Sequence, residues 1–268
     1  MTGLRRAACI ALAAAALLAS PAYPTAFSVD QSDLYYIALE SGWGIQLVQR
    51  GSVIFATMFV YGQSGTPTWY VATLDPTGAA LTWSGDLYAT TGPYFAMVPF
   101  NPANVTATKV GTMTWVAQTT ATGTLNYDVN GTAVTKNVTR QTLVFDDYSG
   151  TYSGTLHAGA TGCTNSANNS PPTDVPFVTI SVTQSDQTVT LSLSLLGAIN
   201  LTISGTLSQS GQFGYVAGPY TSTVGEVGNA TVSELNVQTN SLAGTVSFNS
   251  TNNGCHTNGY FAAVRSTP

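Results

Sequence analysis

The sequence predicts an all-β protein that folds as two consecutive antiparallel meander barrels or sandwiches. Beyond residue 22, apolar residues alternate with a period of two, and no segment carries a sustained helical stripe. Between residues 40 and 71, three short β-type runs are each closed by a glycine or proline turn. Asn130-Gly131 adds a turn whose residues accept the positive φ angles of a two-residue hairpin. These patterns favour antiparallel pairing of strands that are neighbours in sequence.

The first 22 residues are predicted to be a signal peptide. Arg5 and Arg6 precede an apolar run, residues 7–18, and Ser20-Pro21-Ala22 resembles a small-residue cleavage site. That run is too short to span a bilayer, and no later stretch reaches the roughly 18 to 20 apolar residues that spanning requires. We therefore expect a secreted or periplasmic product with no transmembrane segment.

The charge balance excludes nucleic acid as the partner. Without Arg5 and Arg6 the chain keeps five cations against twelve acidic residues, a formal net charge of −7. Binding to a phosphate backbone needs clustered lysine and arginine, which this chain lacks. Only 7% of the residues are charged, so threonine, serine, asparagine and glycine must keep the surface hydrated.

The first predicted domain, residues 23–147, contains all four tryptophans. Its strands are assigned where β-branched and aromatic residues alternate with polar ones between turn signals. The predicted strands are residues 43–48, 53–61, 68–74, 81–88, 109–118, 123–129 and, with an interruption, 132–145.

The second predicted domain, residues 148–268, begins after Asp146-Asp147, where the composition changes. Its eight predicted strands are residues 150–158, 177–182, 189–195, 199–207, 212–217, 232–238, 242–248 and 260–264. In a closed meander of even strand number, the first and last strands are antiparallel neighbours. Cys163 follows the first strand and Cys255 precedes the last, so the topology predicts a disulfide between them. Cys9 lies in the predicted signal peptide.

A short glycine-containing pattern recurs in the predicted strands. It surrounds Gly85, Gly154, Gly205 and Gly244. Glycine inside a strand marks a bend where a sheet curls, which suits small barrels, although chance recurrence in a chain rich in these residues would give the same pattern.

Several of these segments together resemble a module of exported Gram-negative bacterial proteins. The shared elements are an E-S-G-W-G opening at 40–44, an F-A-T-x-F-x-Y strand at 55–61 and a closing T-R-Q at 139–141. The resemblance covers residues 40–145 and implies export but no established activity. Met58 stands where the module usually has tryptophan, which is expected to thin an aromatic surface at that point. The second domain resembles small calycin-type barrels only loosely.

The sequence offers little support for catalysis. A G-x-S-x-G nucleophile motif is absent, and the two histidines, His157 and His256, are expected near one barrel end without an evident third metal ligand. We therefore predict no metal and no cofactor. Four carboxylates are candidates for glycosidase-like acid–base chemistry, namely Glu40, Asp86, Glu226 and Glu234. Glu40 beside Trp43 is the strongest of them, but a carboxylate at the start of a strand is more often a turn cap or, here, a partner for Arg50 or Arg140.

Aromatic residues of the first domain indicate a ligand-binding site. Trp43 and Trp69 are candidates for stacking, with Gln46 and Tyr70 orienting the ligand through hydrogen bonds. The competing interpretation places Trp43, Trp83 and Trp115 in the core, because they alternate with apolar neighbours. We therefore predict an exported, non-catalytic binding or surface-interaction protein whose ligand is a small molecule, a glycan or a protein. The alternatives are a secreted carboxylate-dependent hydrolase and an accessory domain pair for a partner protein.

Overall fold

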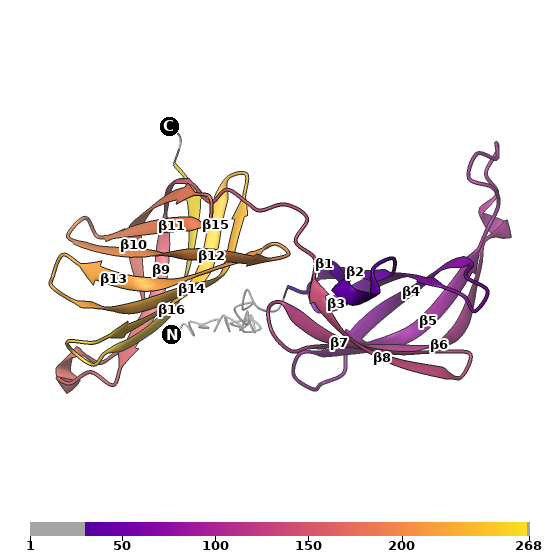
Figure 1. The fold of residues 1–268 in the computed structure, drawn as a ribbon, viewed down its shortest axis with the longest axis horizontal. Coiled ribbons are helices and arrows are strands. Elements are labelled where there is room, and N and C mark those ends of the chain that lie inside the picture. Colours follow the sequence, from indigo (N-terminus) through magenta and orange to yellow (C-terminus); the bar gives the residue numbers. More distant parts are fainter. Residues whose placement is uncertain (1–29, 267–268) are drawn as a thin grey trace, which may run out of the picture.

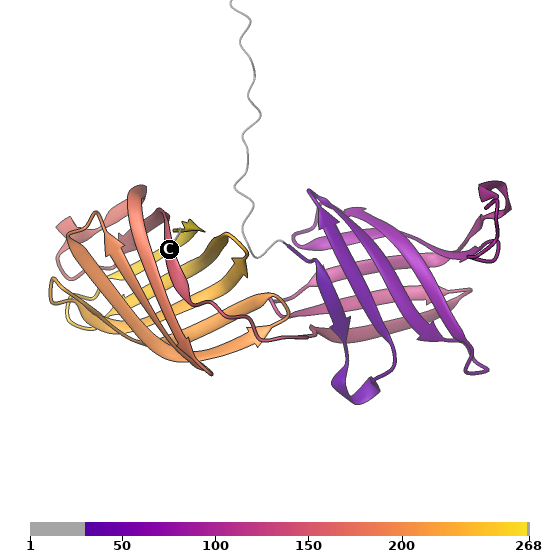
Figure 2. The same cartoon turned by 90° about the horizontal axis from the view of Figure 1, so that it is seen from above.

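The computed structural model describes residues 30–266, which form two consecutive closed antiparallel β-barrels of eight strands each (Figures 1 and 2). The all-β prediction is therefore confirmed, and closed barrels are the form it takes. The predicted signal peptide lies outside the described residues. In the part of the chain that the structure describes, no helix is long and apolar enough to cross a membrane.

The first barrel closes through a strand that the sequence did not predict. Each strand pairs with the next, and β1 pairs with both β2 and β8. The predicted strand over residues 132–145 ends at Arg140. The strands are β1 Asp33–Tyr36, β2 Gly44–Arg50, β3 Val53–Tyr61, β4 Pro67–Pro76, β5 Thr82–Thr91, β6 Thr106–Ala117, β7 Thr122–Val129 and β8 Thr132–Arg140.

The second barrel contains all eight predicted strands, several of them longer than expected. The first and last strands, β9 and β16, pair along ten residues and close the barrel. The strands are β9 Gly150–Thr161, β10 Ser170–Ser185, β11 Thr188–Leu195, β12 Ile199–Ser210, β13 Phe213–Ser222, β14 Val227–Gln238, β15 Ser241–Ser250 and β16 His256–Arg265. Short 3₁₀ turns interrupt the connections at η2 Ala38–Glu40, η3 Pro102–Asn104 and η4 Ser166–Asn168.

Each barrel is filled by its own apolar side chains. Trp83 and Trp115 lie in the first core, as the alternation pattern predicts. Their indole N–H groups are satisfied, Trp83 Nε1 by Ser52 O at 2.8 Å and Trp115 Nε1 by Gln31 Oε1 at 3.2 Å. These bonds matter because an unpaired donor in an apolar core is strongly unfavourable.

The two barrels close with the same set of contacts. In the first barrel, Tyr35 of β1 donates its hydroxyl to Gln31 O, and the guanidinium of Arg140 from the last strand lies 5.1 Å from the Tyr35 ring. In the second, Tyr152 of β9 donates to Tyr148 O, and Arg265 of the last strand lies 4.8 Å from its ring.

A glutamine at the end of the second strand extends the correspondence. Gln49 accepts from Gln31 N at 2.8 Å, and Gln184 accepts from Tyr148 N at 3.0 Å. Each glutamine also donates to the carbonyl oxygen two residues further on. The two barrels therefore close with the same residue types at the same spacing and with corresponding hydrogen bonds.

Glycines allow close strand contacts at the positions predicted to bend. A Cβ placed on Gly85 would lie 2.0 Å from Thr73 O, and one on Gly154 would lie 2.1 Å from Ala262 O. Gly205 is confined in the same way, 2.2 Å from Ala217 O. Any side chain at these three positions would displace backbone, so these glycines have a structural role in curling the sheet. Gly244 differs, because a Cβ there would meet only side chains, Phe261 Cζ at 3.1 Å first.

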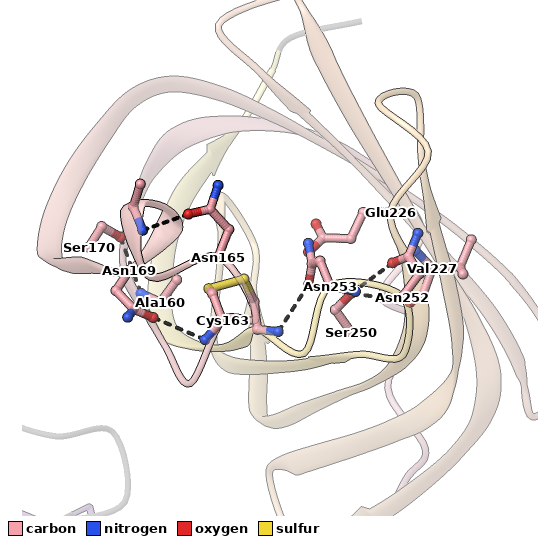
Figure 3. Close-up of a disulfide and its surroundings, with 12 residues drawn as sticks. Ala160, Cys163, Asn165, Asn169, Ser170, Glu226, Val227, Ser250, Asn252 and Asn253 are labelled. Atoms are coloured by element: carbon pink, nitrogen blue, oxygen red, sulfur yellow. Dashed lines mark hydrogen bonds between the residues drawn. A yellow bond between two sulfur atoms is a disulfide. The ribbon is translucent and has the colours of Figure 1, made fainter.

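The predicted disulfide joins Cys163 and Cys255 (Figure 3). It ties the loop between β9 and β10 to the loop between β15 and β16. Asn169 and Asn253 side chains accept from the backbone N–H groups of the two cysteines, each at 3.0 Å. The bond therefore clamps neighbouring loops at one end of the second barrel.

Hydrogen bonds join the two barrels. Asp33 Oδ2 of β1 accepts from Gln212 N at 3.1 Å, and Gln212 Nε2 donates to Ser32 O at 2.8 Å. Thr142, just beyond β8, accepts from Gly211 N at 3.0 Å. The hairpin between β12 and β13 is therefore held against the end of the first barrel.

Candidate ligand-binding face

The outer wall of the first barrel carries a row of exposed aromatic side chains. Phe59 and Trp69 are direct partners on β3 and β4, and their side chains are 47% and 52% exposed. Phe55, also 47% exposed, and Tyr61 project from the same side of β3. Tyr88 of β5 is half-buried and lies opposite Val71 of β4, at the edge of this row. We call this surface the aromatic face; its members are Phe55, Phe59, Tyr61, Trp69 and Tyr88.

The alternation of β3 explains how the aromatic face arises. Ile54, Ala56 and Met58 point into the barrel and are fully buried, so the intervening Phe55 and Phe59 must point outward. The expectation that Met58 thins an aromatic surface is wrong, because its side chain belongs to the core.

Register places polar groups among the rings. Gln46 lies beside Thr57, which lies beside Val71, so these three occupy one row across β2, β3 and β4. Gly44 lies opposite Phe59 in the adjacent row and adds no bulk there. The outer wall therefore combines flat apolar rings with amide and hydroxyl groups.

A groove of about 510 Å³ adjoins the aromatic face where β4 and β5 separate. Phe55 and Tyr88 are among its lining residues, together with Thr73, Asp75 and Asp86. This volume falls within the range of about 300 to 1,000 Å³ that is usual for small-molecule sites. The groove provides hydrogen-bond acceptors beside the rings.

The two groove carboxylates differ in their surroundings. Asp86 Oδ1 lies 2.7 Å from Lys109 Nζ, and this hydrogen bond raises the pKa of the lysine. Asp75 is exposed. Both carboxylates remain near solvent, where they can accept hydrogen bonds from a ligand.

The structure divides the four predicted ligand-binding residues between the two sides of the barrel wall. Trp69 and Gln46 point outward. Trp43 and Tyr70 are partly buried and pack against the first core. The assignment of these four residues to a ligand site stays a prediction, and the geometry favours Trp69 and Gln46. Sequence reasoning missed Phe55, Phe59 and Tyr88.

Trp43 belongs to a small ionic cluster at the barrel rim. Glu40 Oε2 accepts from Trp43 Nε1 at 3.0 Å and from Lys136 Nζ at 2.6 Å. Lys136 Nζ also lies 5.5 Å from the centroid of the Trp43 ring. The partner of Glu40 is therefore Lys136, and the expected pairing with Arg50 or Arg140 is wrong.

Glu40 is poorly suited to act as a general acid. Its hydrogen bonds from Lys136 and Trp43 lower the pKa of the carboxyl group, whereas a glycosidase acid needs a raised pKa. Glu226 accepts from Asn253 Nδ2 at 2.7 Å in the second barrel, and Glu234 accepts from Thr120 at 3.4 Å between the barrels. The four candidate carboxylates are thus distributed over separate parts of the molecule.

The two histidines have separate partners. His157 Nδ1 lies 2.7 Å from Asp174 Oδ1, and its ring stacks on Tyr260. His256 lies 2.6 Å from Asn249 Oδ1 and pairs with Thr161, four residues along β9 from His157. Among residues 30–266, no three His, Cys, Asp or Glu side chains are grouped so that they could hold a metal ion.

Comparisons with known proteins add structural neighbours only. No family model and no curated protein matches the chain. One similar structure is a "putative outer membrane protein" of Bacteroides fragilis, 16% identical with a TM-score of 0.33, covering 87% of this chain and 94% of that one. Another is a protein of unknown function from the DUF3598 family of Nostoc punctiforme, 14% identical with a TM-score of 0.22, covering 84% of this chain and 88% of that one. Neither likeness assigns a ligand or a reaction.

Proposed function

We propose that this chain is an exported, non-catalytic binding protein and that the aromatic face binds a glycan. The observation that carries the proposal is the row of exposed rings on β3 and β4 beside a groove with two carboxylates. Exposed large aromatic residues gathered on one surface mark interaction sites more often than structural ones.

The chemistry of the aromatic face matches that of a sugar chain. Sugar rings offer an apolar C–H face that stacks on aromatic rings, and a rim of hydroxyl groups that hydrogen-bonds to carboxylates and amides. Phe59 and Trp69 supply the stacking surface, while Asp75, Asp86 and Gln46 supply hydrogen-bonding groups around it. Because the flanking groups are acidic, the preferred ligand is a neutral polysaccharide.

Three observations support export. The disulfide suits an oxidising compartment. The first 22 residues have the pattern of a signal peptide, and residues 40–145 resemble an exported module. Both stay predictions, and mass spectrometry of the secreted product can check the cleavage of the signal peptide.

Affinity electrophoresis of the chain from Tyr23 onward, in gels containing neutral polysaccharides, tests the proposal. At least one polysaccharide should retard migration. Trp69→Ala should weaken that binding by about tenfold, equivalent to about 1.4 kcal/mol. The melting temperature should barely change, because the Trp69 side chain is half exposed. Tyr215→Ala is the matched control, since this exposed tyrosine lies on the second barrel.

Three outcomes would contradict the proposal. If no neutral polysaccharide retarded migration, a glycan would not be the ligand. If Trp69→Ala and Tyr215→Ala had equal effects, the aromatic face would not be the binding site. Release of reducing ends from the bound polysaccharide would show catalysis. If that activity were lost in Glu40→Gln with the fold unchanged, the hydrolase alternative would replace the proposed function.

A further inference from the structure

The exposed rings of the aromatic face form two apolar platforms along strand β3. Phe59 and its partner on β4, Trp69, make the first. Phe55, four residues earlier on β3, makes the second together with its partner Val48 of β2, which is 39% exposed. Side chains of a strand alternate between its two sides, so Phe55 and Phe59 leave the same side of the barrel wall. We call these surfaces the Trp69 platform and the Phe55 platform.

A polar row separates the two platforms. The strand rise of about 3.4 Å per residue places Phe55 about 14 Å from Phe59 along β3. Thr57 lies midway between them, with Gln46 of β2 on one side and Val71 of β4 on the other. Gln46 is exposed and Thr57 is half-buried. Along β3 the outer wall therefore changes from apolar to polar and back to apolar.

The platforms lie along the direction in which the barrel wall is straightest. A closed sheet of eight strands curves from each strand to the next, whereas a single strand runs nearly straight. The strands of the first barrel are long, nearly straight ribbons when the molecule is seen from above (Figure 2). A ligand that contacts both platforms must therefore be extended along β3. A coiled chain would leave the surface between them.

We infer that the aromatic face selects an extended, β-1,4-linked chain of neutral sugars, an inference that rests on the glycan function proposed above. In a β-1,4-linked chain of glucose or mannose, the sugar rings follow one another in a nearly straight, flat ribbon. An α-1,4-linked glucan coils, so its successive ring faces turn away from a straight surface. The separation of the platforms exceeds the length of a disaccharide, so only a longer chain reaches both.

The platforms and the polar row have separate tasks in binding such a chain. The Trp69 platform stacks on one sugar ring, and Phe55 stacks on another further along the chain. The Gln46 amide and the Thr57 hydroxyl hydrogen-bond to the hydroxyl groups of the sugar between them. The Phe55 platform therefore adds affinity only for chains that are long enough to reach it.

Isothermal titration calorimetry of the chain from Tyr23 onward, with β-1,4-linked disaccharides and hexasaccharides of glucose and of mannose, tests the inference. One of the hexasaccharides should bind at least about tenfold more tightly than its disaccharide. Maltohexaose, the α-1,4-linked hexasaccharide of glucose, should bind no better than the disaccharide. Phe55→Ala should weaken binding of the preferred hexasaccharide by about tenfold, toward that of the disaccharide. Phe100→Ala is the matched control, since Phe100 is 51% exposed on the connection between β5 and β6.

The inference is wrong if maltohexaose binds as tightly as the β-1,4-linked hexasaccharides, or if a disaccharide binds as tightly as its hexasaccharide. Equal effects of Phe55→Ala and Phe100→Ala would also contradict it. Retardation in the polysaccharide gels without binding of either β-1,4-linked hexasaccharide would do the same. In all these cases a sugar is still bound, so the glycan proposal stands.

Failure of every hexasaccharide, together with no retardation in the gels, would overturn the glycan proposal and this inference with it. The comparison of chain lengths uses the unaltered protein, so it decides the inference whatever the variants do. Unchanged melting temperatures of Phe55→Ala and Phe100→Ala would show that both substitutions leave the fold intact.

Discussion

The guanidinium of Arg140, on the last strand of the first barrel, lies 4.8 Å from the ring centroid of Phe213, the first residue of β13 in the second barrel. Its other neighbour is the ring of Tyr35, so the guanidinium contacts aromatic rings from both barrels. Arg140 also pairs with Asp33 at 3.1 Å and donates to Thr120 O at 2.6 Å. One buried cation thus closes the first barrel and anchors the second.

We expect Arg140→Met to destabilise the first barrel by about 3 to 5 kcal/mol, because it leaves the Asp33 carboxylate without its cation. Urea unfolding followed by tryptophan fluorescence measures this, since all four tryptophans lie in the first barrel. Arg265→Met, at the corresponding but exposed position in the second barrel, is the matched control and should leave this tryptophan-monitored transition unchanged. A loss below about 1 kcal/mol for Arg140→Met would mean that the buried pair contributes no more than a surface one.

Tyr148 and Tyr152 offer a direct test of buried hydroxyl groups. In the described part of the chain, Tyr148 Oη is buried without a hydrogen-bond partner, whereas Tyr152 Oη donates to Tyr148 O and accepts from Arg265 Nη2 at 2.8 Å. Tyr148→Phe should therefore be neutral or stabilise the second barrel by about 1 kcal/mol, and Tyr152→Phe should destabilise it by a similar amount. Urea unfolding monitored by circular dichroism gives both values. Equal losses in the two variants would indicate that Tyr148 has a partner in solution.

Reduction of the disulfide should affect the second barrel alone. The bond joins residues separated by 92 positions, and opening a loop of that length should lower the stability of the second barrel by about 4 to 5 kcal/mol in the chain-entropy model. The tryptophan signal of the first barrel should be unchanged by the reductant. Two free thiols in freshly exported protein, counted by intact mass after alkylation, would contradict the bond itself.

The alternation of apolar and polar residues predicted most of the strands, because each barrel buries one face of every strand. The segment Thr188–Leu195 alternates threonine and serine with valine and leucine, and it forms β11 as predicted. Strand β1 was missed because its four residues are too few to show a period. It is fixed instead by pairing with β2 and β8, which sequence patterns do not reveal.

The aromatic face was less accessible to sequence reasoning. Strand β3 is apolar on both sides, so alternation could not show that Phe55 and Phe59 point outward. Phe59 and Trp69 lie side by side because of the strand register, and that register depends on the whole barrel. The connection between β5 and β6 was left unassigned because its apolar residues follow neither a helical nor a strand period.

The rim cluster of Glu40, Trp43 and Lys136 gives the last prediction, a pH dependence. The hydrogen bonds from Lys136 and Trp43 hold the pKa of Glu40 below its ordinary value of 4.5. A carboxyl group with a lowered folded-state pKa stabilises the fold above its unfolded-state pKa and loses that contribution as the pH falls through the folded-state pKa. The affected window therefore lies below about pH 4.5.

Lys136→Met should return the pKa of Glu40 toward 4.5 and reduce the drop in melting temperature across this window. Carboxyl-carbon NMR titration, with the resonance assigned through Glu40→Gln, measures the shift. An unchanged Glu40 titration in Lys136→Met would show that the 2.6 Å contact does not persist in solution.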